Sequence, residues 1–187
     1  MYKKTNRAAL SVLLLALLAG CGTATKSVPT QSATPTSTAA MVIPTDCEKT
    51  GMLSALNAIV PDSLYIKTTW QPAAGTELAD FLTNGGVACS YGLQSQEIGI
   101  TTQWVSDAKG LFENRVAGWM AEGFKKIDIP DLDESEAYFQ IKKQSPTQEF
   151  HVWRVNMKYH GAWIQLSCTA FAQDLATGYP LLKAATI

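Results

Sequence analysis

Polar and apolar residues alternate through the middle of the chain. Residues 97–105 carry Ile98, Ile100, Thr102 and Trp104 at every second position, with polar or small residues between them. A period of two is typical of a β-strand that buries one face. Residues 87–93 form a second candidate strand directly before it, so two neighbouring strands are expected here.

The C-terminal third has the same alternation on both sides of a turn. Residues 149–159 and 162–169 flank His160 and Gly161, and a two-residue turn sets the register of a hairpin. The predicted cross-strand pairs are Tyr159 with Ala162, Met157 with Ile164, Val155 with Leu166, and Trp153 with Cys168. All eight side chains are apolar or small, so this face of the hairpin is predicted to be buried.

Helical spacing appears in two further stretches. Thr45 and Glu48 form a capping-box pattern ahead of an apolar series that ends before Pro61. Residues 108–120 carry one apolar stripe, with Ser106 or Asp107 as candidate N-caps and Gly123 as a stop. The expected fold is α+β: a mostly antiparallel sheet covered by an amphipathic helix on one face, with an N-terminal helix and a C-terminal hairpin.

The outward face of the hairpin is the candidate binding surface. Its members are polar or cationic, apart from one indole: Arg154, Asn156, Lys158, Trp163 and Gln165. An exposed indole beside cations stacks well on a sugar or on an aromatic partner. The alternative is that a second helix, or the C-terminal segment 171–187, covers Trp163.

The N-terminus has the layout of a secretory signal. Lys3, Lys4 and Arg7 precede an apolar run over residues 8–18, which is too short to span a bilayer. The run ends in Leu-Ala-Gly-Cys at residues 18–21, which resembles the lipobox of bacterial lipoproteins. That resemblance implies a diacylglyceryl group on Cys21, a lipid anchor in the membrane, and a location on the outer face of the cytoplasmic membrane.

Composition then divides the chain into three parts. Residues 1–20 are the predicted lipoprotein signal peptide, and residues 21–40 are the lipidated cysteine with a linker rich in Thr, Ser and Pro. Such a linker buries too little apolar surface to order itself, and its r.m.s. length is roughly 25 Å. Residues 41–187 are long enough for a single extracellular α+β domain with its own core.

Charge and motifs exclude several classes of partner. Without Lys3, Lys4 and Arg7, 12 of the 15 basic residues remain against 16 acidic ones, so nucleic acid is not an expected partner. There is no C-x-x-C pair and there are two histidines, which argues against zinc. The acidic run over residues 128–136 lacks the D-x-D-x-D-G order of a calcium loop. No metal and no cofactor are expected.

Three cysteines remain after the anchor: Cys47, Cys89 and Cys168. Outside the cytoplasm two of them are expected to pair, and an odd count permits three pairings. Loop entropy does not choose among these, because all three loops give about 4–5 kcal/mol.

Three motifs together resemble a family of actinobacterial surface lipoproteins of unassigned function. They are Asp46-Cys47 at the head of a helix, Gly-Val-Ala-Cys-Ser-Tyr at 86–91, and Leu-Asp-Glu-Ser-Glu-Ala-Tyr at 132–138, with Asp133 in place of the family's glycine and Ser135 as an extra residue. The resemblance implies a Cys47–Cys89 disulfide and a buried thiol at Cys168. It also implies a compact α+β domain similar to mycobacterial lipoproteins and kinase sensor domains.

Catalysis is not expected, because the chain has no G-x-S-x-G and no H-E-x-x-H motif. The first functional hypothesis is a non-enzymatic ligand-binding or sensing module. The second is an envelope protein that docks another exported protein and has no small-molecule site. The interior distinguishes them: a binding module is expected to line a cavity with Trp104, Trp119, Trp153 and Met157, whereas an interaction protein packs them tightly and exposes an apolar patch.

Overall fold

The computed structural model describes residues 39–94, 96, 98–143, 151–169 and 175–187. The predicted signal peptide, Cys21 and the linker up to residue 38 lie outside these residues. The helical elements are η1 (Cys47–Lys49), α1 (Met52–Asn57), α2 (Glu77–Thr83), α3 (Leu111–Glu122) and α4 (Leu175–Ala184). Within the described ranges no helix is long and apolar enough to cross a bilayer.

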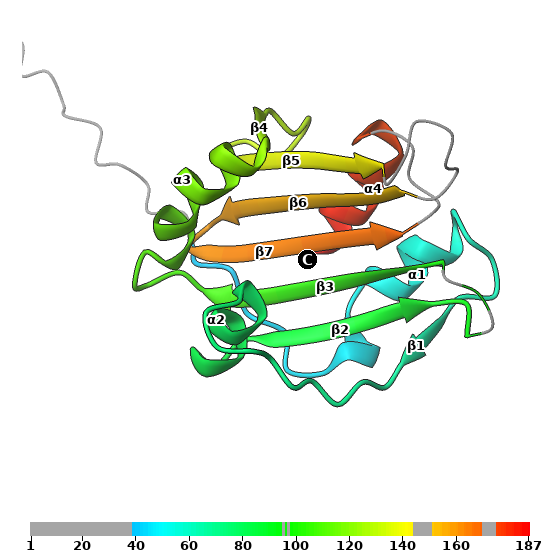
Figure 1. Cartoon of the computed structure of the whole chain (residues 1–187). Helices are drawn as coiled ribbons and strands as arrows, with labels where there is room; N and C mark the ends of the chain where they lie inside the picture. The colour runs from blue at the N-terminus through cyan, green and yellow to red at the C-terminus, as the bar shows by residue number, and fades with distance from the viewer. Residues whose placement is uncertain (1–38, 95, 97, 144–150, 170–174) are drawn as a thin grey trace, which may run out of the picture. The chain divides into compact units, whose positions relative to one another are not determined.

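A seven-stranded antiparallel sheet forms the centre of the fold (Figure 1). Its strands are β1 (Leu64–Ile66), β2 (Val87–Gly92), β3 (Gly99–Ser106), β4 (Lys125–Ile127), β5 (Glu136–Lys143), β6 (His151–Tyr159) and β7 (Ala162–Thr169). They lie in the order β1-β2-β3-β7-β6-β5-β4. The predicted α+β class with an antiparallel sheet is confirmed.

The β6–β7 hairpin has the register that the alternation predicts. Tyr159 pairs with Ala162, and Trp153 pairs with Cys168 at the far end. The turn residues His160 and Gly161 both have positive φ, at 44° and 75°. Two successive residues with positive φ are typical of a two-residue hairpin turn. The backbone twist of such a turn matches the twist of the two strands that it joins.

Helices α1 and α4 pack on one face of the sheet, which we call the α4 face. Met52 and Leu56 of α1 and Leu181 and Leu182 of α4 join one apolar cluster with side chains of the sheet. At the end of α4, Trp104 Nε1 donates a hydrogen bond to the carbonyl oxygen of Ala185 at 2.8 Å. Cys168 lies buried on this face as a free thiol, and its burial raises the pKa of the thiol.

Helices α2 and α3 lie on the opposite face, which we call the α2 face (Figure 1). Phe81 of α2 and Phe112 and Trp119 of α3 form a second apolar cluster with Val105 and Trp163 of the sheet. The sequence predicts a helix on one face of the sheet, whereas the structure has helices on both. The reason is that α1 and α4 are short segments from the two ends of the domain, and their pairing is not visible in any local pattern.

The N-terminal segment differs from the predicted capping box. Asp46, and not Thr45, accepts the backbone N–H of Glu48 at 3.0 Å and begins the short η1 helix. The helix α1 starts afterwards at Met52 and ends at Asn57, before Ile59. A disulfide joins Cys47 to Cys89 of β2, with 5.6 Å between their Cα atoms. The Tyr91 hydroxyl, donating to the Cys47 carbonyl oxygen at 2.7 Å, holds the same segment.

Candidate functional site

The predicted binding surface of the hairpin is largely covered. Trp163, Asn156 and Gln165 are buried, while Arg154 and Lys158 keep partial exposure. The Trp163 ring lies 4.2 Å from Phe81 of α2 and 5.5 Å from Trp119 of α3, between ring centroids. Of the two alternatives for Trp163, the structure shows coverage by helices, because α2 and α3 supply an aromatic layer over the indole. The C-terminal segment, the other candidate cover, packs on the α4 face instead.

The predicted cavity lined by tryptophans is wrong. Trp104, Trp153 and Met157 pack in the cluster of the α4 face, and Trp119 packs in the cluster of the α2 face. All four are at most 1% exposed. Four side chains divided between two faces of a sheet cannot line one cavity. Trp119 is separated from the other three because α3 packs on the α2 face.

A chain of hydrogen bonds runs under the second cluster on the α2 face. Trp163 Nε1 donates to Asn156 Oδ1 at 3.0 Å, and Gln165 Nε2 donates to the same oxygen at 2.8 Å. Gln165 Nε2 also donates to a carboxylate oxygen of Glu77, whose other oxygen accepts from Trp119 Nε1. Gln103 Nε2 donates to Gln165 Oε1 at 2.7 Å. Six side chains from α2, α3 and three strands are thereby joined.

The indole groups determine the direction of this network. An indole N–H only donates, so Asn156 must present its oxygen to Trp163, and Gln165 must then present its amide N–H groups. Gln165 consequently presents its oxygen to Gln103, which turns its own N–H groups inward. The orientation of each side-chain amide is therefore fixed by its neighbour. The last acceptor of the series, Gln103 Oε1, has no donor among the described residues.

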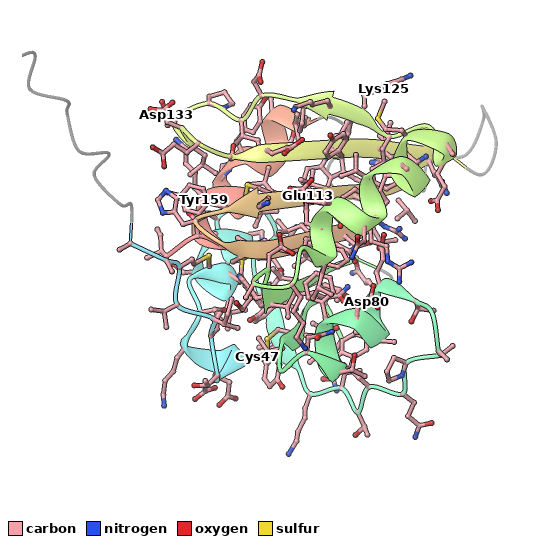
Figure 2. The ribbon with its side chains drawn as sticks, turned by 90° about the vertical axis from the view of Figure 1, so that its left-hand side faces the viewer. Cys47, Asp80, Glu113, Lys125, Asp133 and Tyr159 are labelled. Atoms are coloured by element: carbon pink, nitrogen blue, oxygen red, sulfur yellow. A yellow bond between two sulfur atoms is a disulfide. The ribbon has the colours of Figure 1, made fainter. Side chains whose placement is uncertain are left out.

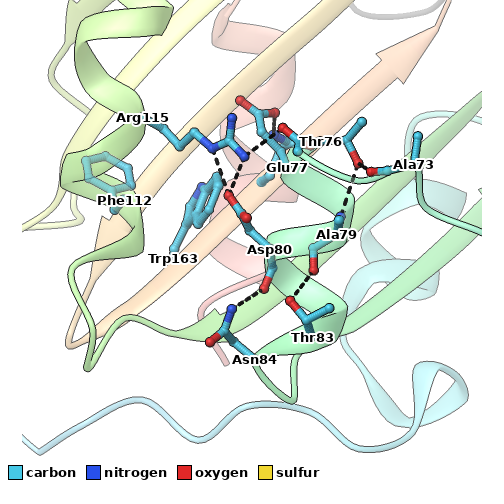
Figure 3. Close-up of polar contacts among 12 residues, drawn as sticks. Ala73, Thr76, Glu77, Ala79, Asp80, Thr83, Asn84, Phe112, Arg115 and Trp163 are labelled. Atoms are coloured by element: carbon cyan, nitrogen blue, oxygen red, sulfur yellow. Dashed lines mark hydrogen bonds and ion pairs between the residues drawn. The ribbon is translucent and has the colours of Figure 1, made fainter.

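Two arginines lie beside this network, each already paired with an acid. Figure 3 shows the first of them, Arg115, beside Asp80. Arg115 of α3 contacts Asp80 of α2 at 2.6 Å and donates to the Gly75 carbonyl oxygen at 3.0 Å. Arg154 of β6 lies 3.5 Å from Glu77, whose side chain is only 16% exposed. Glu77 is the first residue of α2, where the helix dipole favours a negative charge.

These groups border a hollow of about 490 Å³ on the α2 face. Its polar lining includes Glu77, Arg115, Arg154, Gln103, Gln165 and Ser167. The hollow exists because α2 and α3 cover only one end of the strands, while no described helix covers the other end on this face (Figure 1). Antiparallel sheets commonly leave part of a face open to solvent in this way.

A row of small polar side chains continues from the hollow across the sheet. Ser90 pairs with Thr101, Thr101 pairs with Ser167, and Ser167 pairs with Arg154, so all four point to the α2 face. A second hollow of about 430 Å³ includes Ser90 and shares Thr101 and Ser167 with the first. We call the two hollows together the polar groove.

A charged cluster lies at the turn end of the hairpin. Lys158 donates to Glu113 of α3 at 2.6 Å, which raises the pKa of Lys158, and it lies 3.5 Å from Asp107. Hydrogen bonds from Lys126 and Tyr138 lower the pKa of Glu136, the cross-strand neighbour of Lys158. The labelled Glu113 projects over the sheet in Figure 2. Since every charge here has a close partner of opposite sign, the cluster joins α3 and β5 to the hairpin.

The sequence reasoning missed the residues that matter most in the groove. Glu77, Arg115 and Gln103 were not candidates, although Gln103 and Thr101 share a strand parity that points away from the apolar face. That parity was a usable signal for the floor of the groove. Glu77 and Arg115 had no comparable signal, because surface helices commonly carry acids and arginines.

The structure offers no arrangement for metal chemistry in the part of the chain that it describes: no group of three or more His, Cys, Asp or Glu side chains is placed to hold an ion. His160 stacks on Tyr159, with 3.9 Å between ring centroids, and its Nε2 lies 3.6 Å from Glu134. In comparisons with family models, curated proteins and solved structures, nothing matches this chain.

Proposed function

We propose that the chain is a non-enzymatic lipoprotein, anchored through Cys21 on the outer face of the cytoplasmic membrane, whose folded domain binds a small polar ligand. The binding site is the polar groove on the α2 face. The tether of residues 22–40 holds the domain near the membrane without pressing it against the lipid. The protein then captures its ligand outside the cell, or presents it to another envelope protein.

One observation supports this choice of binding site. Amide, carboxylate and guanidinium groups, each held in place by other contacts, lie together on an uncovered part of the sheet. They come from α2, α3, β3, β6 and β7, so the tertiary fold assembles them. Binding sites typically combine a concave surface with a few polar groups held in place by other contacts. The Glu77 carboxylate and the Gln165 amide are held in this manner.

Native mass spectrometry of the full chain, purified from its own envelope, tests the site. We expect a co-purifying small molecule that leaves on denaturation. Ser167→Tyr fills the groove where its two hollows meet, and we expect it to abolish this adduct. Thr69→Tyr adds the same ring at an exposed position outside the groove and is expected to keep the adduct. An empty wild-type chain, or an adduct retained by Ser167→Tyr, contradicts the proposal.

The anchor has its own test. Cys21→Ala removes the thiol that the lipobox resemblance assigns to lipidation, and two acyl chains are needed for stable attachment. We expect the variant to lose palmitate labelling and to leave the membrane fraction. Cys168→Ala serves as the matched control, because its thiol is buried in the domain core. A Cys21→Ala chain that stays labelled contradicts the anchor.

A second candidate is an envelope protein that docks another exported protein. The tight packing of Trp104, Trp119, Trp153 and Met157 favours it, since an interaction protein is expected to fill its interior. Val42 and Ile187 are also strongly exposed, at 85% and 93%, and border a common hollow. Cross-linking in whole cells through a cysteine introduced by Val42→Cys distinguishes the two candidates. Capture of a protein partner, together with no small-molecule adduct in native mass spectrometry, favours docking.

A further inference from the structure

The charge balance of the polar groove restricts the ligand. Arg115 and Arg154 are the cations in the lining of its first hollow, and each is paired with a carboxylate, Asp80 or Glu77. The exposed Glu122 adds a further negative charge at the rim. An anionic ligand therefore finds no unpaired cation there. A cationic ligand meets two guanidinium groups, which donate hydrogen bonds and cannot accept them.

The mixture of hydrogen-bonding groups narrows the class further. The groove presents donors from the arginines, acceptors from the acids, and hydroxyls of Thr101 and Ser167 that act as both. A neutral ligand that fits must offer donors and acceptors side by side. Hydroxyl groups do this at every position, because each one both donates and accepts.

The shape indicates an elongated ligand. The row from Ser90 through Thr101 and Ser167 to Arg154 crosses four strands. Neighbouring strands lie about 4.8 Å apart, so the row is roughly 14 Å long. This length exceeds a single sugar ring and matches a short run of linked rings.

The position on the sheet argues against a peptide. Peptides that add to a sheet pair with an edge strand, whereas β2, β3, β7 and β6 each have strands on both sides. A ligand in the groove therefore contacts side chains, and the polar lining offers no deep apolar pockets for peptide side chains. The three tryptophans and the methionine of the predicted cavity are fully packed elsewhere.

We infer that the polar groove binds a neutral, polyhydroxylated chain, a stretch of oligosaccharide, along the row from Ser90 to Arg154. This inference rests on the proposed function and names the ligand class of the same site. Hydrogen bonds provide most of the affinity, since the described residues of the row carry hydroxyl and guanidinium groups and no aromatic ring. Loss of two hydroxyls from the floor is therefore expected to weaken binding at least about tenfold.

Saturation-transfer NMR on the full chain tests the inference, in a zwitterionic detergent that contains no sugar. The probes are tetrasaccharides of glucose, mannose and N-acetylglucosamine, with tetraalanine and tetraglutamate as comparators. We expect at least one tetrasaccharide to bind and both peptides to fail. Thr101→Val with Ser167→Ala removes two hydroxyls without adding bulk, and Thr69→Val is the matched exposed control. Circular dichroism verifies that each variant is folded.

Three results overturn the inference: no tetrasaccharide binds, a peptide binds in preference, or the double variant binds as tightly as the wild type. Its failure is separable from that of the proposed function. If the tetrasaccharides fail while native mass spectrometry still shows an adduct that Ser167→Tyr removes, the groove is a binding site for another class of ligand. If the tetrasaccharides fail to bind and native mass spectrometry shows no adduct, the proposed binding site is contradicted as well.

Discussion

Gly178 of α4 lies directly against the ring of Trp153 on β6. A Cβ placed on Gly178 would be 2.1 Å from Trp153 Cζ2, closer than real side chains approach. The ring has little room to move, because Trp153 is fully buried and packs edge-on against Phe139 at 5.7 Å between centroids. This contact sets how closely the last helix approaches the sheet.

Gly178→Ala is therefore expected to destabilise the protein by about 1–3 kcal/mol, although alanine favours a helix over glycine. The matched control is Gly118→Ala in α3, where an added Cβ meets nothing within 4 Å. That control is expected to gain about 1 kcal/mol. Urea unfolding measures both values, and equal stabilities for the two variants would contradict the close contact.

The Cys47–Cys89 disulfide closes a loop with a sequence separation of 42. Chain entropy predicts that replacing both cysteines by alanine costs about 4 kcal/mol of unfolding free energy. Urea unfolding with and without reductant provides an internal control. Reductant is expected to lower the stability of the wild type and to leave the double variant unchanged. Equal sensitivity of the two proteins to reductant would show that the bridge is absent.

Glu77 holds two buried donors, Trp119 Nε1 and Gln165 Nε2. Glu77→Ala leaves Trp119 Nε1 without an acceptor and Gln165 Nε2 with Asn156 Oδ1 alone, and an unsatisfied buried donor costs about 1–3 kcal/mol. Glu122→Ala, which removes an exposed acid from the same hollow, is expected to change stability by less than about 0.5 kcal/mol. Thermal unfolding of the two variants compares them. A Glu77→Ala variant as stable as Glu122→Ala is incompatible with the hydrogen-bond network described above.

Glu136 provides a test by pH. Its hydrogen bonds from Lys126 and Tyr138 lower the pKa of the carboxyl below its ordinary value of 4.5. A lowered pKa in the folded state contributes stability above the unfolded pKa and loses it as the pH falls through the folded value. Wild type is thus expected to exceed Glu136→Gln in stability at neutral pH, with a difference that disappears as the pH falls through the lowered pKa of the folded state. A stability difference that grows on acidification would show that the pKa of Glu136 is raised in the folded state, and not lowered. Glu122→Gln serves as the control.

Much of the sheet could be predicted from the sequence. The hairpin register follows from the alternation and from His160-Gly161, because shifting one strand by a residue would bring its apolar face into solvent. Helix α2 also carries a local signal, because Thr76 caps it and accepts the Ala79 N–H at 3.3 Å. Gly123 ends α3 in the left-handed region at a φ of 95°. These features depend on neighbours close in the chain.

The candidate site could be predicted only in part. Arg154 and Gln165 were chosen from strand parity, and both line the groove. Trp163 was assigned to the same surface and is fully buried. Parity distinguishes the two faces of a strand, but it does not say which helices cover each face, and that depends on contacts such as Phe81 with Trp163.

By itself the sequence determined local conformations: the alternating strands, the hairpin turn, and the C-terminal end of α3 at Gly123. These follow from backbone sterics, capping and side-chain period, which act over a few residues. It did not determine where α3 begins, because Gly110 and not Ser106 or Asp107 is the N-cap of that helix. Only the tertiary structure decided that Cys47 bonds to Cys89, that α2 and α3 bury Trp163, and that Glu77 meets Arg154. Such pairings join residues 42 or more positions apart, and packing across the whole domain selects them because no local energy distinguishes one partner from another.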